Sequence, residues 1–448
     1  MTTTSKILLA LLPLAIALTS RAQDTLESYS LKEARAYALE HNINVKNADL
    51  DVEKAKKQVW ETTAIGLPQV NSSFSYNNNI DLATQLLPGE FFGQPGQFVE
   101  VQFGTQHNAT ANVSANQIIF SGPYIVGLQA ARTFKNISAH QKVKTRIETK
   151  YAVTQAYYSI LVARENIEFL KKTKSNMEDL LADITATWQE GLAEETDVDQ
   201  IRINLLEINN QLSTLQRQAD VGKSALKYQM GLPMSETIEL RDSLTGILSA
   251  MNLEQAGGKT LKAEDHIDYK IVNTQERMRY LEMQREKTEY LPSISAFYSH
   301  QQNAMREEFN YFDGNDNKWF TSNVIGLQVE MPIFSSGSRL SKVQQAQIEL
   351  EKTQNQKKQL QQSLQMNVQQ ARTSYMSALE RYHTQKENLQ LAQKVYQKSL
   401  TRFKEGMSSS SLLTQNHNQL LNNQTSYYQA IYELLNASNE LNKALNEY

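Results

Sequence analysis

Residues 188–200 read WQEGLAEETDVDQ, and residues 403–415 read FKEGMSSSSLLTQ. Both stretches begin with an aromatic residue, continue with Glu-Gly two positions later and end in Gln, at a constant offset of 215 residues. Each glycine interrupts a long run with helical periodicity. Because glycine adopts a left-handed backbone at little steric cost, Gly191 and Gly406 each predict the end of one helix and a reversal into the next.

Two further landmarks recur in the same order in both halves of the chain. TAIGLPQV, which contains Leu67-Pro68, matches TEYLPSI, which contains Leu291-Pro292, and IIFSGPY matches PIFSSGS. The offsets are 224 and 214 residues, so an insertion of about ten residues separates two otherwise parallel halves. Each half therefore has the order helix, short β-like region, very long helix, turn and helix.

The helices that meet at the turns are unusually long. Between residues 360 and 403, apolar or aromatic residues recur about every 3.6 positions, which predicts a nearly straight helix with one narrow apolar stripe. At ~1.5 Å per residue, residues 337–404 would form a rod of roughly 100 Å, and residues 124–189 one of similar length. No single core buries such rods, so they must lie beside other rods or copies of themselves. The stripe includes three tyrosines that we expect to pack between helices: Tyr375, Tyr382 and Tyr396.

Polar residues mark where the helices begin. Ser30 starts the sequence S-L-K-E, a capping-box pattern with Glu33, and predicts a first helix that continues toward Ala64. After the two turns, Thr196 with Asp199 and the serines at 408–411 are the expected caps of the returning helices.

Four segments alternate apolar residues with small polar ones and therefore predict strands with one apolar and one wet face: 69–82, 107–120, 293–301 and 322–334. The loops between paired strands contain PGEFFGQPG and NYFDGNDNKWF, whose aromatic residues suit a membrane interface. Alternation alone also fits two soluble hairpins packed on the helices. In lipid, open strand edges would leave unpaired backbone groups that cost several kcal/mol each, so several chains would have to close one barrel.

The composition fits an exported, helix-rich protein. Only 17 Gly and 8 Pro occur in 448 residues, and the mean hydropathy of −0.52 indicates helices with wet surfaces. Residues 1–22 read as a signal peptide, with Lys6 before an apolar stretch and small residues at the cleavage positions. Removing it changes the net charge from −3 to −5, so no basic excess indicates nucleic acid as a partner.

Several chemistries find no support in the residues. The chain has no cysteine, which excludes disulfides and thiolate sites. Seven histidines lack metal-ligand spacing, and we expect them on the surface or on a pore wall: His41, His107, His140, His266, His300, His383 and His417. Neither a phosphate-binding loop nor a nucleophile motif is present, so we predict no enzyme, no metal and no cofactor. Any energy for transport must then come from a partner protein.

From about Ser30 to Leu445, the chain resembles the TolC-type outer-membrane efflux proteins. SLKEARAYALEHN, with Leu67-Pro68 downstream, is similar to the opening helix of that family. The FSG and FSSG turns resemble its passage from strand to helix, and WQEGL and FKEGM resemble its two periplasmic helix tips. Each motif is weak alone, but the set in duplicated order is specific.

The resemblance implies a mainly α fold with a membrane β-barrel. Long antiparallel helices would form a periplasmic α-barrel, and four strands per chain would contribute to a trimeric, twelve-stranded barrel in outer-membrane lipid. The function implied is a passive exit duct of a tripartite efflux or type I secretion system, located in the outer membrane and extending into the periplasm. Its partners would be a periplasmic adaptor protein and an inner-membrane transporter, with a cargo that the sequence does not name. A soluble periplasmic coiled-coil scaffold or adaptor is the alternative.

The expected organisation follows from the repeat and the resemblance together: a signal peptide at 1–22, a first repeat at 23–230 with its tip at 191–196, a small equatorial segment at 231–263, and a second repeat at 264–448 with its tip at 406–411.

The resemblance also assigns roles at the two tips. Adaptor docking would use a glycine followed by a small or apolar residue, matched by Gly191-Leu192 and by Gly406-Met407. Family members carry aspartates six and nine residues after the second glycine, where this chain has Leu412 and Gln415. The first tip instead supplies three acids that three chains could arrange as a gating ring: Glu194, Glu195 and Asp197. The alternative is that these acids are solvated charges at an ordinary helix start.

Overall fold

The computed structural model describes residues 27–251, 261–312 and 318–448, so the expected signal peptide lies outside the described residues. The chain divides into two compact units, each built from three segments. The tip unit, which holds both glycine turns, comprises the described residues of Met1–Asn42, Lys150–Glu254 and Ala378–Asn436. The sheet unit, which holds the four-stranded sheet, comprises those of Ile43–Thr149, Gln255–Ser377 and Ala437–Tyr448.

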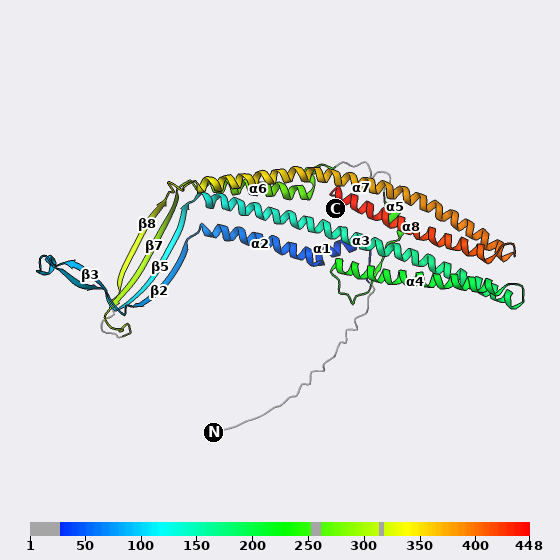
Figure 1. The fold of residues 1–448 in the computed structure, drawn as a ribbon, viewed down its shortest axis with the longest axis horizontal. Coiled ribbons are helices and arrows are strands. Elements are labelled where there is room, and N and C mark those ends of the chain that lie inside the picture. Colours follow the sequence, from blue (N-terminus) through cyan, green and yellow to red (C-terminus); the bar gives the residue numbers. More distant parts are fainter. Residues whose placement is uncertain (1–26, 252–260, 313–317) are drawn as a thin grey trace, which may run out of the picture. The chain divides into compact units, whose positions relative to one another are not determined.

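The sheet unit is built around four antiparallel strands in the order β2-β5-β7-β8, which lie side by side in Figure 1. The strands are β2 (Gln69–Asn78), β5 (His107–Phe120), β7 (Ser293–Arg306) and β8 (Phe320–Glu330). The unit's helical elements are α2 (Ile43–Ile65), η3 (Ala263–Asp265), α6 (Ile267–Thr288) and the first parts of α3 (Gly122–Gln189) and α7 (Ser338–Lys404).

The strand register separates two chemically different faces. Val70, Ala115, Tyr298 and Ile325 are cross-strand neighbours on one face, which is apolar near the helices. Asn71, Ser114 and Ser299 are neighbours on the other face, where Ser299 donates a hydrogen bond of 2.8 Å to Asn112. Large apolar side chains on the first face are exposed, with Phe74 at 69% and Ile325 at 83%. Among the described strands, β2 and β8 pair on one side only, so both edges of this sheet are open.

The strand ends differ from the expected ranges for local reasons. β2 ends at Asn78, and the next residue, Asn79, turns its side chain to the carbonyl of Thr105. β7 runs on to Arg306 because β5 continues beside it as far as His107. β8 ends at Glu330, two residues before Pro332, which lacks the N–H that a ladder needs.

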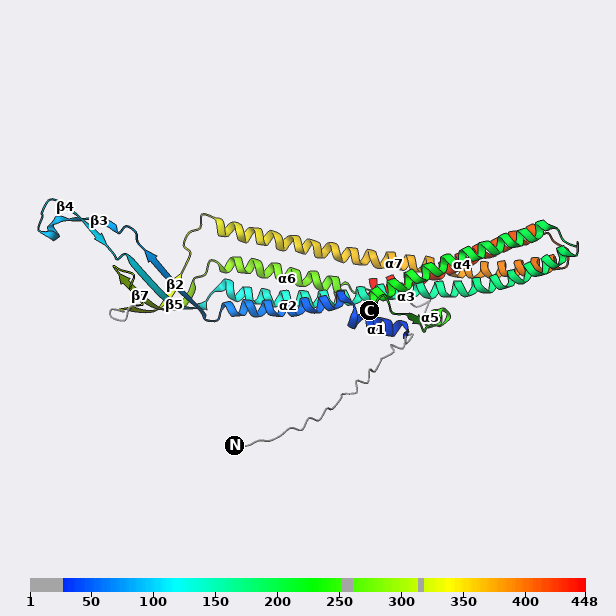
Figure 2. The ribbon, with the colours of Figure 1, turned by 90° about the horizontal axis from the view of Figure 1, so that it is seen from below.

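A second, separate hairpin lies between β2 and β5, in a segment where the sequence predicted only a loop. It consists of β3 (Ala83–Pro88), the 3₁₀ turn η1 (Gly89–Phe92) and β4 (Phe98–Phe103), and its strands pair only with each other within the described chain. Figures 1 and 2 both show it extending beyond the ends of β2 and β5.

The tip unit is a bundle of long helices. It contains α1 (Leu31–His41), α4 (Glu195–Met230), most of α8 (Ser410–Ala444) and the last parts of α3 and α7. One apolar cluster joins the four long helices: Leu170, Met177, Leu180 and Ile184 of α3, Val198, Ile201 and Ile208 of α4, Leu389, Ala392 and Tyr396 of α7, and Leu413, Leu420 and Leu421 of α8. The predicted stripe of α7 is confirmed, since Tyr375, Tyr382 and Tyr396 are all buried.

The first helix is shorter than predicted. The capping box at its start is confirmed, because the Ser30 N–H donates to Glu33 Oε2 at 2.8 Å and the Glu33 N–H donates to Ser30 Oγ. However, the expected single helix to Ala64 is wrong: α1 ends at His41, and Asn42 leaves the helical conformation with φ −59° and ψ 132°. The Asn42 side chain instead donates to the carbonyl of Gln229 in α4 at 2.7 Å.

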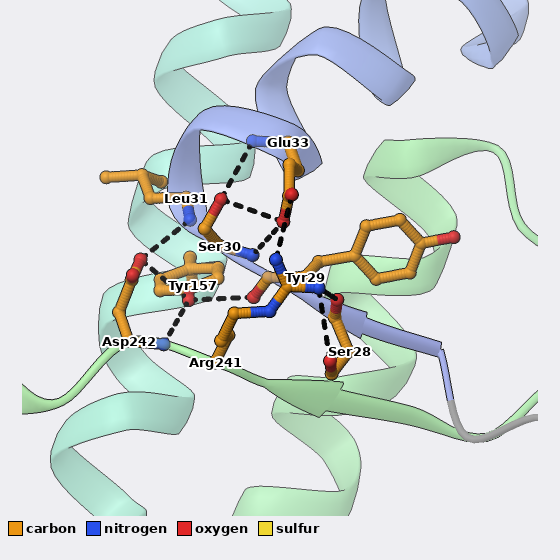
Figure 3. Close-up of polar contacts among 8 residues, drawn as sticks. All are labelled: Ser28, Tyr29, Ser30, Leu31, Glu33, Tyr157, Arg241 and Asp242. Atoms are coloured by element: carbon orange, nitrogen blue, oxygen red, sulfur yellow. Dashed lines mark hydrogen bonds and ion pairs between the residues drawn. The ribbon is translucent and has the colours of Figure 1, made fainter.

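A network of polar contacts, called here the clasp, holds the start of the described chain in the tip unit (Figure 3). It involves Ser28, Tyr29, Ser30, Leu31, Glu33, Tyr157, Arg241 and Asp242. Strand β1 (Glu27–Tyr29) pairs in parallel with β6 (Ile238–Leu240), which is followed by α5 (Leu244–Ala250). Asp242 Oδ2 accepts from the Leu31 N–H at 2.8 Å and lies 2.9 Å from the Tyr157 hydroxyl, and burial raises the pKa of that hydroxyl. Arg241 pairs with Glu33 at 2.9 Å. Hydrogen bonds from Ser30, assisted by Arg241, hold the pKa of the Glu33 carboxyl below its usual value.

Candidate functional site at the helix turns

The first turn links α3 to α4 through a left-handed glycine. Gly191 has φ +75°, its N–H donates to the Trp188 carbonyl at 2.8 Å, and the next N–H, from Leu192, donates to Thr187 at 3.0 Å. These two bonds form a Schellman motif, which satisfies two of the four carbonyls that a helix end leaves free.

The second turn repeats the first in backbone detail. Gly406 has φ +73°, and its N–H donates to Phe403 at 3.0 Å, while the Met407 N–H donates to Arg402 at 2.8 Å. Every donor and acceptor is displaced from the first turn by 215 residues, and the predicted left-handed glycines are confirmed. Within the described chain, a Cβ at either glycine would meet nothing within 4 Å, so the positive φ alone requires glycine.

The residue after each glycine carries an apolar side chain into solvent. Leu192 is 77% exposed and Met407 is 67% exposed in the single chain. Such a residue often packs back on the end of its own helix in this motif. Here both side chains are available to another protein, so the structure presents the expected docking pairs Gly191-Leu192 and Gly406-Met407 at the surface.

The helices that leave the turns are capped differently. At the first turn, Asp197 Oδ2 accepts from the Glu194 N–H at 3.4 Å, and the Thr196 hydroxyl donates to the Glu194 carboxylate at 3.1 Å. The expected cap at Thr196 with Asp199 is therefore wrong: Glu194 is the N-cap, and Asp199 pairs with Arg202 at 3.0 Å. At the second turn a serine acts as expected, since Ser409 Oγ accepts from the Leu412 N–H at 3.3 Å.

The three acids named by the sequence lie together on one turn. Glu194, Glu195 and Asp197 fall within four consecutive positions, and two of them take part in the local hydrogen bonds of the helix start. Glu195 is exposed. The second turn has no carboxylate at the place equivalent to Asp197, where Leu412 is 46% exposed. Each chain therefore brings these three acids to the first turn only, because the equivalent positions in the second turn hold Ser409, Ser410 and Leu412.

An ion pair near the turns was not foreseen. Lys404 Nζ, at the end of α7, lies 2.9 Å from Asp183 of α3, and both side chains are about half exposed. It connects the two helices that lead into the turns. The sequence holds no signal for it, because these residues do not occupy equivalent positions in the two repeats.

Polar side chains also lie in the core beneath the turns. Asn204 of α4 donates to the Thr414 hydroxyl of α8 at 2.9 Å, and Gln424 of α8 donates to Asn166 of α3 at 2.7 Å. His417 is fully buried beside the Tyr396 ring, and neither ring nitrogen has a hydrogen-bond partner within the described residues. Burial lowers the pKa of His417 to about 4.

The expectation that the histidines lie on the surface is thus wrong for His417, and also for His266, which is 7% exposed. His417 lies four residues after Leu413 on the apolar stripe of α8, so helical periodicity could have placed it in the core.

Neither a metal centre nor a spanning helix occurs at the site. Residues 27–251, 261–312 and 318–448 contain no group of three His, Asp or Glu side chains that could hold a metal ion. Over the same residues, no helix has both the length and the apolarity needed to cross a membrane. The exposed apolar side chains of the turns, Leu192 and Met407, suit contacts with another protein. The acids of the first turn, which the second turn lacks at the equivalent positions, suit contacts with cations.

Solved structures resemble this fold over nearly its whole length. CusC has a TM-score of 0.73 at 16% identity, with 94% of this chain and 92% of that chain covered. CmeC of Campylobacter jejuni has a TM-score of 0.71 at 16% identity, with 93% and 85% covered. VceC of Vibrio cholerae has a TM-score of 0.69 at 14% identity, with 93% and 95% covered. No curated protein sequence matches the chain.

A family model described as outer membrane efflux protein matches residues 35–232 and 282–447, well over half of the chain. The expected fold class, mainly helical with a sheet like that of outer-membrane channels, is confirmed by the solved structures. The family consists of channel proteins of the outer membrane, not enzymes. The chain belongs to the outer membrane efflux protein family.

Proposed function

We propose that three copies of this chain form a channel-tunnel, the exit duct of a tripartite efflux or type I secretion system. The coarser role, an efflux channel in the outer membrane, follows from family membership. The finer proposal comprises closure by three chains, passive conduction, and gating and docking at the two turns.

One observation carries the proposal: the sheet is two-faced and open at both edges. Its apolar face exposes Val70, Phe74 and Ile325. Contact of these apolar side chains with lipid is favourable, whereas their contact with water is not. Its other face carries Asn and Ser, which suit a water-filled lumen. The open edges of β2 and β8 need partners wherever water is absent, and copies of the same chain supply them symmetrically. Three chains would give a barrel of twelve strands.

Passive conduction is the simplest mechanism consistent with the residues. The sequence has no phosphate-binding loop, so the inner-membrane transporter would supply the energy. We infer that the repeats at 23–230 and 264–448, with the small segment at 231–263, are the units of duplication, although each compact unit of the fold contains pieces of both repeats.

The turns are the proposed gate and docking surface. Leu192 and Met407 would enter apolar sites on an adaptor, with Gly191 and Gly406 fixing the chain reversal that presents them. Three copies of Glu194, Glu195 and Asp197 would form an acidic ring, while the second turn has no acid at the equivalent positions.

Planar bilayer recordings test the channel. Purified protein added to a lipid bilayer should produce discrete conductance steps, with a cation preference if acids line the narrow point. A coiled-coil scaffold would leave the bilayer silent, and silence from protein extracted from the outer membrane in mild detergent would contradict the proposal. Family membership favours the channel over the scaffold.

A further inference from the structure

The hairpin formed by β3, η1 and β4, called here the outer hairpin (residues 83–103), forms a separate two-stranded sheet that pairs with no other described strand. Its strands pair only with each other among the described residues. A lone two-stranded hairpin is marginally stable in water. A hairpin that extends beyond its sheet therefore needs a surface that covers it.

The outer hairpin is also rich in exposed apolar side chains. Five large ones are at least half exposed: Leu86 at 62%, Phe91 at 80%, Phe92 at 50%, Phe98 at 72% and Phe103 at 50%. Its only charged residues are Glu90 and Glu100, and it has no lysine or arginine. Apolar side chains gathered in this way mark a contact surface, unlike scattered single ones.

The register shows that these side chains occupy both faces of the outer hairpin. Leu86 pairs with Glu100 and Pro88 with Phe98, so Leu86 and Phe98 share one face. Leu87 pairs with Val99, Gln85 with Val101 and Ala83 with Phe103, so the valines and Phe103 share the opposite face. A hairpin resting on one flat surface would need only one apolar face. A subunit in a closed ring contacts two neighbours through two different surfaces.

The position of the outer hairpin also indicates those neighbours. It grows from the end of β2, whose other edge is open and, under the proposed closure, meets β8 of a second copy. The outer hairpins of all copies then lie at the same level, next to the subunit boundaries. Anionic lipid headgroups suit this surface poorly, because its two charged residues are both acidic.

We propose that the outer hairpin binds a second copy of this chain, with the Leu86 face of one hairpin packed against the Val101 face of the next. This inference rests on the proposed trimer and adds a contact outside the strand edges. It gives the insertion in the first repeat a role: no described strand lies in the matching connection between β7 and β8.

Disulfide trapping tests the contact. The natural chain has no cysteine, so every disulfide that forms must involve an introduced cysteine. A double variant, Leu86→Cys with Val101→Cys, places one thiol on each face at nearly the same height. The two thiols of one chain point to opposite faces and do not meet, whereas facing thiols of neighbours can. Mild oxidation in the membrane should convert most of the double variant into a covalent trimer on a denaturing gel. Each single variant should remain a monomer.

A second variant covers the case in which the cysteines disturb the hairpin. Replacing residues 80–105 by Asn-Gly closes the β2–β5 ladder with a two-residue turn, because Asn79 already bonds to Gln106. The trimer should still form but dissociate at a temperature lower by several degrees than the intact protein.

The outcomes separate this inference from the proposed function. A protein that is trimeric by native mass, yields no covalent trimer and keeps its dissociation temperature after the replacement would overturn the hairpin contact alone. Quenching of a Phe91→Trp variant by brominated acyl chains, beyond that of the unmodified protein, would assign the surface to lipid and also overturn it. A monomer by native mass would overturn both proposals.

Discussion

The two turns share a backbone and differ in side chains. Both end a long helix with a Schellman motif at a glycine, and each hydrogen bond of one has its equivalent 215 residues away in the other. Yet the first is followed by Glu194, Glu195 and Asp197, and the second by four serines. Duplication has preserved the geometry that reverses the chain, while the charge that a partner or an ion would meet has diverged. The two turns are therefore equivalent as structure and distinct as surfaces.

Loss of either glycine should have the largest effect. Gly191→Pro removes the N–H that bonds to Trp188 and forbids φ +75°, at a cost of about 3 kcal/mol or more. Export should be abolished while the protein still reaches the outer membrane, as measured by efflux from whole cells and by membrane fractionation. Gly127→Ala, in the interior of α3 with open space around it, is the matched control and should be tolerated. Retained export in Gly191→Pro would show that the first turn tolerates another shape.

Core substitutions behind the turns should have the next largest effect. Leu413 and Val198 are equivalent by the same offset, and both are buried in the cluster under the turns. Leu413→Ala should destabilise the protein by about 3 to 4 kcal/mol. Val198→Ala, which removes less apolar volume, should cost about 2 kcal/mol. Thermal unfolding in detergent measures both, and a larger loss for Val198→Ala would mean that the first turn carries more of the packing.

The stability of the two helices that leave the turns should depend differently on pH, because α8 contains a buried histidine, His417, and α4 contains no histidine. The pKa of His417 falls from an ordinary 6.5 to about 4 on burial, so the unfolded chain binds a proton there before the folded one does. The contribution of His417 to the free energy of unfolding is complete above pH 6.5. It is lost as the pH falls from 6.5 through 4, by up to about 3 kcal/mol.

Replacing the buried histidine tests that account. His417→Leu should remove this part of the pH dependence, measured as thermal stability between pH 7 and 4, and should raise stability at pH 7 by about 1 kcal/mol. His383→Leu, at an exposed position of α7, is the control and should leave the slope unchanged. An unaltered slope in His417→Leu would assign the acid sensitivity to other groups.

Neutralising the first turn should have the smallest effect on the fold and a specific effect on ions. Glu194→Gln, Glu195→Gln and Asp197→Asn together should weaken block of the channel by divalent cations several-fold in bilayer recordings, because they remove nine charges from a trimer of the proposed kind. Glu405→Gln at the second turn is the control and should change the block less. An unchanged block in the triple variant would discard the acidic ring and leave these acids as helix-capping charges.

Periodicity and local chemistry account for what the sequence predicted well. The apolar stripe of α7 predicted its buried tyrosines, and the repeated Glu-Gly predicted both glycines with a left-handed backbone. The sequence S-L-K-E predicted the cap of the first helix. These features depend on residues close together in the chain. The roles of the tip residues remain predictions, since they depend on other chains. The division into repeats also remains a prediction, because each compact unit contains pieces of both repeats.

Contacts between distant residues account for what the sequence missed. The break at Asn42 depends on a carbonyl of α4, and the clasp depends on Asp242 meeting Tyr157 and Leu31. The pairing of Lys404 with Asp183 likewise requires the bundle to be assembled. The outer hairpin is different, because its alternation is short and mixed, and aromatic residues in a loop gave no sign of a second sheet.

The native mass of the protein shows whether three chains close the open sheet. Protein extracted from the outer membrane in mild detergent should give, by light scattering corrected for detergent, three chains of about 49 kDa each, which is the 51.0 kDa chain less its expected signal. A monomer would contradict the account, because the unpaired edges of β2 and β8 would then have no partner in lipid.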